Sequence, residues 1–81
     1  MNRLARTLGL TDHPAFVAIR KKLDDDDTGN TVVLVEYRTD HPDYEGGFQV
    51  EVYDSTDYLI LDEAAPQDER TDLAHYLNLS P

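Results

Sequence analysis

Cysteine is absent from this 81-residue chain, and long apolar runs are absent as well. Without thiols, the chain forms no disulfide, no thiolate zinc site and no iron–sulfur cluster, and it has no cysteine nucleophile. Its apolar runs, such as residues 32–35, are far shorter than the roughly 20 residues that a membrane-spanning helix needs. The two arginines near the N-terminus precede no apolar stretch, so we expect a cytoplasmic protein without a signal peptide.

Basic residues are scarce: seven lysines and arginines stand against 17 acidic residues, which gives a net charge of −10. The chain is short enough that we expect one acidic domain over residues 1–81. Residues 1–30 contain five basic and five acidic side chains, whereas residues 31–81 contain two basic and twelve acidic ones. The whole imbalance therefore lies in the second part, and its sign disfavours direct binding to nucleic acid or to an anionic membrane.

Helical spacing characterises the first 23 residues. Leu4 and Leu8 lie one helical turn apart, which predicts a short first helix. A second helix is predicted to begin near Pro14, a residue suited to the first turn, and its apolar stripe comprises Phe16, Ile19 and Leu23. The acidic residues 24–27 and the Thr-Gly-Asn that follows them are typical of an exposed turn, which ends this helix.

From residue 31 the apolar period changes to two, which predicts strands near residues 31–38, 48–54 and 58–61. In the second strand we expect one set of side chains to point inward, namely Phe48, Val50 and Val52. The alternate set is expected to point outward into solvent, namely Gln49, Glu51 and Tyr53. The long link over residues 39–47 is expected to be an ordered but mobile loop.

A final helix is predicted from Pro66, with a buried face made of Leu73, Tyr76 and Leu77. The element order is then ααβββα: N-terminal helices, a three-stranded antiparallel β-meander and a C-terminal helix. We therefore predict an α+β fold in which the helices cover one face of the sheet.

No catalytic motif is visible, so we expect a non-enzymatic protein without a cofactor. A carboxyl group that acts as a general acid needs an apolar pocket, whereas the acids here fall in turns and at outward strand positions. The three histidines, His13, His41 and His75, lack the paired spacing typical of zinc ligands.

One segment resembles the opening of a calcium-binding loop, because Asp24, Asp26 and Thr28 alternate before a glycine. A full loop needs a bidentate Glu at its twelfth position, where this chain has Val35. We expect a solvated acidic turn and no metal site, and a small calcium-binding domain on these three residues is the alternative.

The remaining feature is an array of acidic residues with tyrosines among them. Alternate residues of an extended segment project about 6.6 Å apart, a spacing comparable to that of phosphates along a nucleic-acid strand. Tyrosine is favoured at protein interfaces because it combines an apolar ring with a polar tip. We expect this acidic face to bind a larger basic protein, and its candidate contacts are Asp43, Tyr44, Glu45, Glu51, Tyr53, Asp54, Asp57 and Tyr58.

The expected element order, the chain length and the acids gathered in residues 31–81 resemble small phage-encoded inhibitors of the anti-CRISPR type. Several of those inhibitors are acidic DNA mimics. The resemblance implies an inhibitor that occupies the nucleic-acid-binding surface of an effector, and no residue of that family is carried over to this chain.

The composition also resembles that of haloarchaeal proteins, because Asp outnumbers Glu twelve to five and Arg outnumbers Lys five to two. Such a surface keeps a protein soluble in concentrated salt. This second resemblance implies a halophile-adapted acidic protein with a housekeeping or complex-assembly role.

Salt dependence separates the two interpretations of the charge. A halophile-adapted protein should be poorly folded in dilute buffer, whereas an inhibitor from a low-salt habitat should already be folded there and gain little from added KCl. The measurement is the melting temperature against KCl concentration. A melting temperature that climbs steadily to molar KCl, where the Debye length is already only about 3 Å, would assign the charge to a high-salt habitat.

Overall fold

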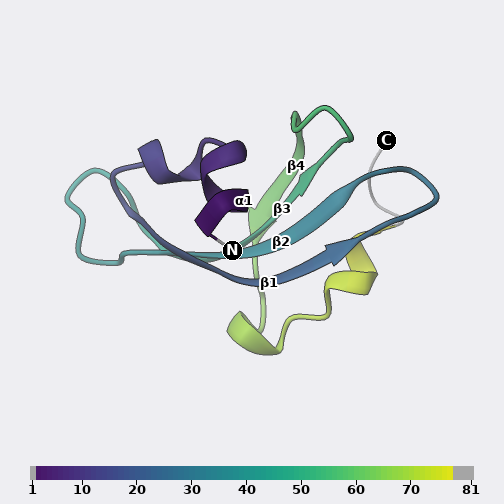
Figure 1. Ribbon diagram of the computed structural model, residues 1–81. Coiled ribbons are helices and arrows are strands. Elements are labelled where there is room, and N and C mark those ends of the chain that lie inside the picture. Colours follow the sequence, from purple (N-terminus) through teal and green to yellow (C-terminus); the bar gives the residue numbers. More distant parts are fainter. Residues whose placement is uncertain (1, 78–81) are drawn as a thin grey trace.

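The computed structural model describes residues 2–77, and its centre is a four-stranded antiparallel sheet (Figure 1). The strands follow one another in a meander: β1 (Phe16–Asp24), β2 (Thr31–Tyr37), β3 (Gly47–Tyr53) and β4 (Leu59–Ala64). The helical elements are short: α1 (Asn2–Thr7) and the 3₁₀ turns η1 (Leu10–Asp12), η2 (Asp68–Arg70) and η3 (Leu73–Tyr76). The protein is therefore mainly β, and the predicted α+β order ααβββα with three strands is wrong.

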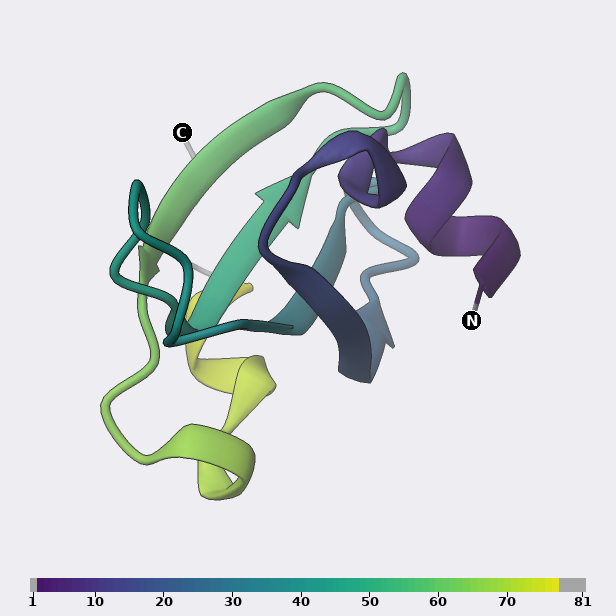
Figure 2. The same ribbon diagram turned by 90° about the vertical axis from the view of Figure 1, so that its left-hand side faces the viewer.

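The sheet is covered on both faces. In Figures 1 and 2, α1 and η1 lie on one side of the sheet, and η2 and η3 lie on the other. The core of the N-terminal face consists of Ala5, Leu10, Ala15, Ile19, Val33, Val35, Tyr37 and Tyr53. The core of the C-terminal face consists of Val32, Leu34, Val50, Val52, Leu73 and Tyr76. Since alternate residues of β2 enter opposite cores, residues 32–35 are all fully buried.

The second predicted helix is strand β1, and irregular pairing explains why its sequence has helical spacing. The register against β2 shifts between Phe16 and Ala18 and again between Ile19 and Lys21. A bulge adds one residue to a strand and so changes which face the following side chains meet. Phe16 and Ile19, three residues apart, thus pack in the same core, while Leu23 packs in the opposite one.

The predicted C-terminal helix is absent, although two of its expected core residues, Leu73 and Tyr76, are buried. Asp68 adopts a left-handed φ of 54°, which stops a right-handed helix from propagating beyond Pro66. The chain instead forms two separate 3₁₀ turns, and the Asp72 side chain accepts the Ala74 N–H at 3.0 Å at the start of the second. Within residues 2–77, no helix has the length and apolar character to cross a membrane.

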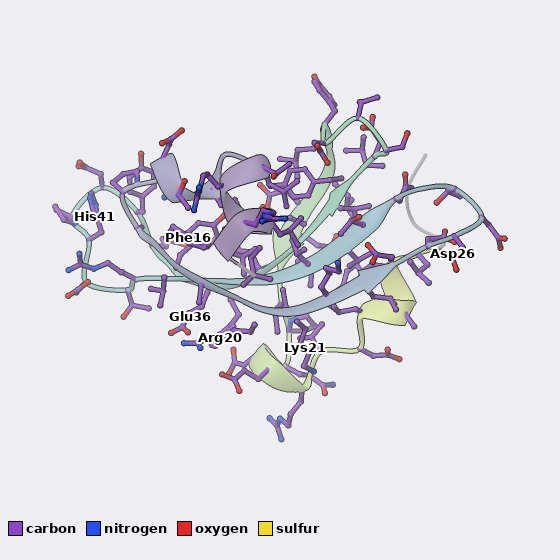
Figure 3. All side chains as sticks on the ribbon, viewed as in Figure 1. Phe16, Arg20, Lys21, Asp26, Glu36 and His41 are labelled. Carbon is purple, nitrogen blue, oxygen red and sulfur yellow. The ribbon has the colours of Figure 1, made fainter. Side chains whose placement is uncertain are left out.

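The two edge strands of the sheet carry opposite charges. β1 contains Arg20, Lys21 and Lys22, whereas β4 contains Asp62 and Glu63 and no basic residue. Two of these cations already have partners on the C-terminal side of the sheet (Figure 3). The Arg20 guanidinium lies 2.5 Å from the Glu36 carboxylate, and the Lys21 ammonium donates to the Thr71 carbonyl at 3.3 Å. None of the salt bridges found within residues 2–77 uses Asp62 or Glu63, so the β4 edge is the acidic edge of the sheet.

Burial of Leu34 should dominate stability, because its side chain is the largest of those that the two cores bury completely. We expect Leu34→Ala to lower the free energy of unfolding by about 2–5 kcal/mol. The matched control is Leu59→Ala, which removes the same atoms from a side chain that is 40% exposed, and it should cost less than about 1 kcal/mol. Urea denaturation followed by circular dichroism measures both, and equal losses would contradict the two-core assignment.

Candidate functional site

A pocket of about 370 Å³ opens on the N-terminal face, between η1, the loop of residues 38–46 and strands β3 and β4. This volume falls within the range of small-ligand sites. The pocket is lined by Leu10, His13, Tyr37, Tyr44, Glu45, Gly46, Gln49, Glu51, Tyr53, Leu59 and Asp62. Four of the eight predicted contact residues are thus brought together here, namely Tyr44, Glu45, Glu51 and Tyr53.

Glu51 is a buried acid of this pocket, with only 4% of its surface exposed. Its Oε2 accepts the Tyr37 hydroxyl and its Oε1 accepts the Tyr53 hydroxyl, each at 2.5 Å. The outward, solvated positions predicted for Glu51 and Tyr53 are wrong, because both residues are buried and Tyr53 belongs to the core of the N-terminal face. A buried carboxylate needs hydrogen-bond donors, and these two hydroxyls supply them.

Burial and the hydrogen bond to Glu51 raise the pKa of both Tyr37 and Tyr53 well above the usual tyrosine range. The negative charge of Asp62 raises the pKa of both tyrosines further. Both hydroxyls therefore stay protonated near neutral pH and act as hydrogen-bond donors. The Tyr37–Glu51–Tyr53 group is consequently a fixed carboxylate held between two neutral donors.

Aromatic rings form one wall of the pocket. The ring centroid of His13 lies 4.8 Å from that of Tyr37 and 4.5 Å from that of Tyr44. Tyr44 also contacts His41 at 5.0 Å, so its ring lies against two imidazoles. In each histidine, Nδ1 accepts the backbone N–H two residues further on, at 3.0 and 3.1 Å. These bonds fix the imidazoles and thereby place Tyr44, which is 43% exposed, at the pocket rim.

The loop that carries Tyr44 and Glu45 depends on a close backbone approach at Gly46. Gly46 has φ 75°, and a Cβ on it would lie 1.8 Å from the Arg38 carbonyl oxygen. Only glycine fits there, because any side chain would overlap the opposite arm of the loop. Arg38 also holds Asp40 through two hydrogen bonds of 2.9 and 3.1 Å. The loop is thus closed at its base by contacts that its own residues make.

The charge of the pocket is negative, since Glu45, Glu51 and Asp62 all line it. Glu51 and Asp62 are direct partners across the β3–β4 ladder, a position in which like charges repel. No lysine or arginine lines the pocket, and the salt bridges found within residues 2–77 use other acids. The pocket therefore gathers carboxylates without a lysine or arginine of its own chain.

The other predicted contacts lie outside the pocket. Asp43 is exposed in the loop, and Asp57 and Tyr58 are exposed in the β3–β4 turn, where Tyr58 is 70% exposed. Asp54 shapes that turn: its Oδ1 accepts the Thr56 hydroxyl and the backbone N–H groups of Thr56 and Tyr58. These hydrogen bonds lower the pKa of Asp54 below its ordinary value, so its carboxylate is already engaged within the turn.

The acidic turn between β1 and β2 is closed by its own side chains. Asp25 accepts the Thr28 hydroxyl at 2.8 Å, and Asp24 accepts the Thr31 hydroxyl at 3.0 Å. Residues 24–27 lead into a turn, so their carboxylates do not project at the regular spacing of an extended segment. Among residues 2–77, no three histidine or carboxylate side chains come together in a group that could hold a metal ion. The calcium site on Asp24, Asp26 and Thr28 stays an untested alternative, because a threonine hydroxyl is not part of such a group.

Comparison of the chain with protein-family models, with curated proteins and with solved structures finds no match in any of the three. The resemblance to anti-CRISPR inhibitors and to haloarchaeal proteins therefore stays a prediction. Its architectural part relied on helices followed by three strands, an order that this chain does not have.

Sequence reasoning missed three of the residues that define the site: His13, Tyr37 and Asp62. Residues 31–38 alternate so that Tyr37 shares a side of the strand with Val33 and Val35, and this alternation is the signal in the sequence for a buried Tyr37. Nothing in the sequence indicated that the side of β3 that carries Glu51 and Tyr53 is also buried. His13 and Asp62 belong to the site because the end of η1 and strand β4 border the same pocket.

Alkaline pH should unfold the protein before its buried tyrosines ionise. The pKa values of Tyr37, Tyr53 and Tyr76 are all raised in the fold, whereas tyrosine in an unfolded chain titrates near pH 10. The stability that these groups contribute is fully present below pH about 10 and is lost progressively above it. We expect tyrosinate absorbance in the folded protein to report fewer than the five tyrosines of the sequence.

The control is the same titration in concentrated urea, in which all five tyrosines should ionise together. Five tyrosines that ionise while the circular dichroism of the sheet is intact would contradict the buried Tyr37–Glu51–Tyr53 group.

Proposed function

We propose that this protein is a non-enzymatic binding protein, located in the cytoplasm, whose acidic face engages a basic surface of a larger protein. The surface that it occupies is of the kind that otherwise holds nucleic acid, so binding inhibits the partner by competition. One observation carries the proposal: the 370 Å³ pocket is lined by three carboxylates and by no lysine or arginine. A partner with exposed basic side chains would supply what the pocket lacks.

The distribution of charge supports the same partner chemistry. The basic strand β1 lies at the sheet edge opposite the acidic strand β4, so the acidic pocket is flanked by β4 and by the loop with Asp43 and Glu45. Separation of this kind gives the molecule a negative side, which accelerates and orients the approach of a basic partner. Carboxylates on that side meet the same lysines and arginines that a nucleic acid would otherwise neutralise.

Two exposed apolar groups lie on the same side and support a protein partner. Tyr44 stands at the pocket rim, and Leu59 of β4 lines the pocket while 40% exposed. Interface energy usually comes from a few aromatic or apolar anchors that lose their water, while surrounding charges set specificity and association rate. Tyr44 is the anchor we propose, with Asp43, Glu45 and Asp62 as the surrounding charges.

Charge reversal tests the proposal. We expect Asp43→Lys/Glu45→Lys to abolish capture of a basic protein from nuclease-treated lysate at 0.15 M salt, near physiological ionic strength. A DNA duplex added as competitor should release the protein that the wild type captures, because both would occupy one surface. Recovery is measured by quantitative mass spectrometry of the bound fraction.

The matched control is Asp26→Lys/Asp27→Lys, which makes the same charge change in the β1–β2 turn. Figure 3 shows Asp26 and His41 at opposite ends of the molecule, so this control leaves the proposed face unchanged. It should retain the captured protein. Equal recovery by all three proteins, or capture that the duplex does not reverse, would show the proposal to be wrong.

A further inference from the structure

We infer that the pocket between loop 38–46 and strands β3 and β4 receives the guanidinium group of an arginine side chain from the partner. The inference rests on the proposed function for the source of that arginine. Its chemistry is carried by three features of the pocket itself: aromatic rings, carboxylate acceptors, and the absence of a lysine or arginine among the lining residues.

Aromatic rings suit a guanidinium more than they suit a strongly hydrated ammonium. Tyr37, Tyr44, Tyr53 and His13 all line the pocket, and Tyr44 has 43% of its surface exposed. A guanidinium is planar and weakly hydrated, so it stacks on an aromatic face and gains a cation–π attraction there. The imidazoles packed against Tyr44 hold its ring in place, which lowers the entropy that binding would otherwise cost.

The carboxylates supply the acceptors that a guanidinium needs. It has five N–H donors in one plane, and a carboxylate can take two of them in parallel. Glu45 and Asp62 line the pocket and are exposed, so they are available to pair with an incoming group. Each oxygen of Glu51 already accepts a tyrosine hydroxyl, so Glu51 is not the group that pairs directly with the guanidinium. Its negative charge adds to the negative electrostatic potential of the pocket.

The cross-strand pair of Glu51 and Asp62 gives the pocket a further reason to favour a cation. Their like charges repel across the ladder, and an inserted guanidinium would reverse that interaction into attraction. An anion would meet three carboxylates, and a neutral group would leave the repulsion in place. An arginine is therefore the occupant that the lining residues complement most fully.

The experiment titrates the whole protein with Nα-acetyl-arginine-N-methylamide and follows its backbone amides by NMR. This probe carries the guanidinium on a neutral backbone. The comparators are the citrulline analogue, which has nearly the same shape and no charge, and the lysine analogue. We expect shift changes centred on Glu45, Gly46 and Asp62 at millimolar arginine probe, weaker changes with lysine and none with citrulline.

Variants locate the site without touching the buried group. Glu45→Gln/Asp62→Asn removes two charges with little change of shape, and it should weaken the affinity for the arginine probe about tenfold. The control Asp26→Asn/Asp27→Asn removes the same charge at the far turn and should leave the affinity within twofold, an amount set by long-range potential.

Three results would overturn the inference: shift changes away from the pocket, equal binding of the lysine or citrulline probe, or an affinity that Glu45→Gln/Asp62→Asn leaves unchanged. The lysate experiment fails independently. If the arginine probe binds as described while charge reversal leaves protein capture intact, the pocket assignment holds and the proposed partner surface is wrong. If capture depends on the acidic face and the probe does not bind, the opposite conclusion follows.

Discussion

Burial of β2 on both faces is the constraint on which the rest of this structure depends. Residues 32–35 are four consecutive apolar side chains, and in a strand they must point alternately to opposite sides. A sheet with only one covered face would leave half of them in water. The chain meets this demand by placing its N-terminal segment over one face and its C-terminal segment over the other. With 81 residues, neither covering is a full α-helical layer.

The pocket is a consequence of how the N-terminal face is covered. α1, η1 and the residues that follow pack over β1 and β2, while β3 and β4 extend beyond them, with Leu59 still partly exposed. Polar side chains where the N-terminal covering of the sheet ends therefore line the pocket. Glu51 is the clearest case, because its position would be solvated in a one-sided sheet. Here it is buried and held by the hydroxyls of Tyr37 and Tyr53.

The uneven charge of the molecule follows from the same arrangement. The cations of β1 lie at one edge of the sheet, where Glu36 and the Thr71 carbonyl engage Arg20 and Lys21. Asp62 of β4 and Glu45 of loop 38–46 line the pocket. The loop keeps its shape through the Arg38–Asp40 pair and the close approach at Gly46. Local contacts thus hold Tyr44 and Glu45 in place.

The sequence by itself determined the net charge, its concentration in residues 31–81, the short N-terminal helix, and two strands predicted near residues 31–38 and 48–54, which are observed at Thr31–Tyr37 and Gly47–Tyr53. These depend on local periodicity and on charge, which a chain carries wherever it folds. It misled at Phe16, Ile19 and Leu23, because two bulges in β1 reproduce helical spacing. It misled again at Pro66, where the left-handed Asp68 replaces a helix with 3₁₀ turns.

Tertiary structure alone decided the site. Tyr44 and Glu45 could be named as candidates from their setting among acids, and both do line the pocket. The partnership of Tyr37, Glu51 and Tyr53, and the approach of His13 and Asp62, join residues from η1, β2, β3 and β4 or from their borders. Alternation assigns each side chain to a face of its strand, but it does not say which faces another segment will cover. That choice is made by packing between distant segments, and it turned a predicted solvent-exposed acid into the buried carboxylate of the pocket.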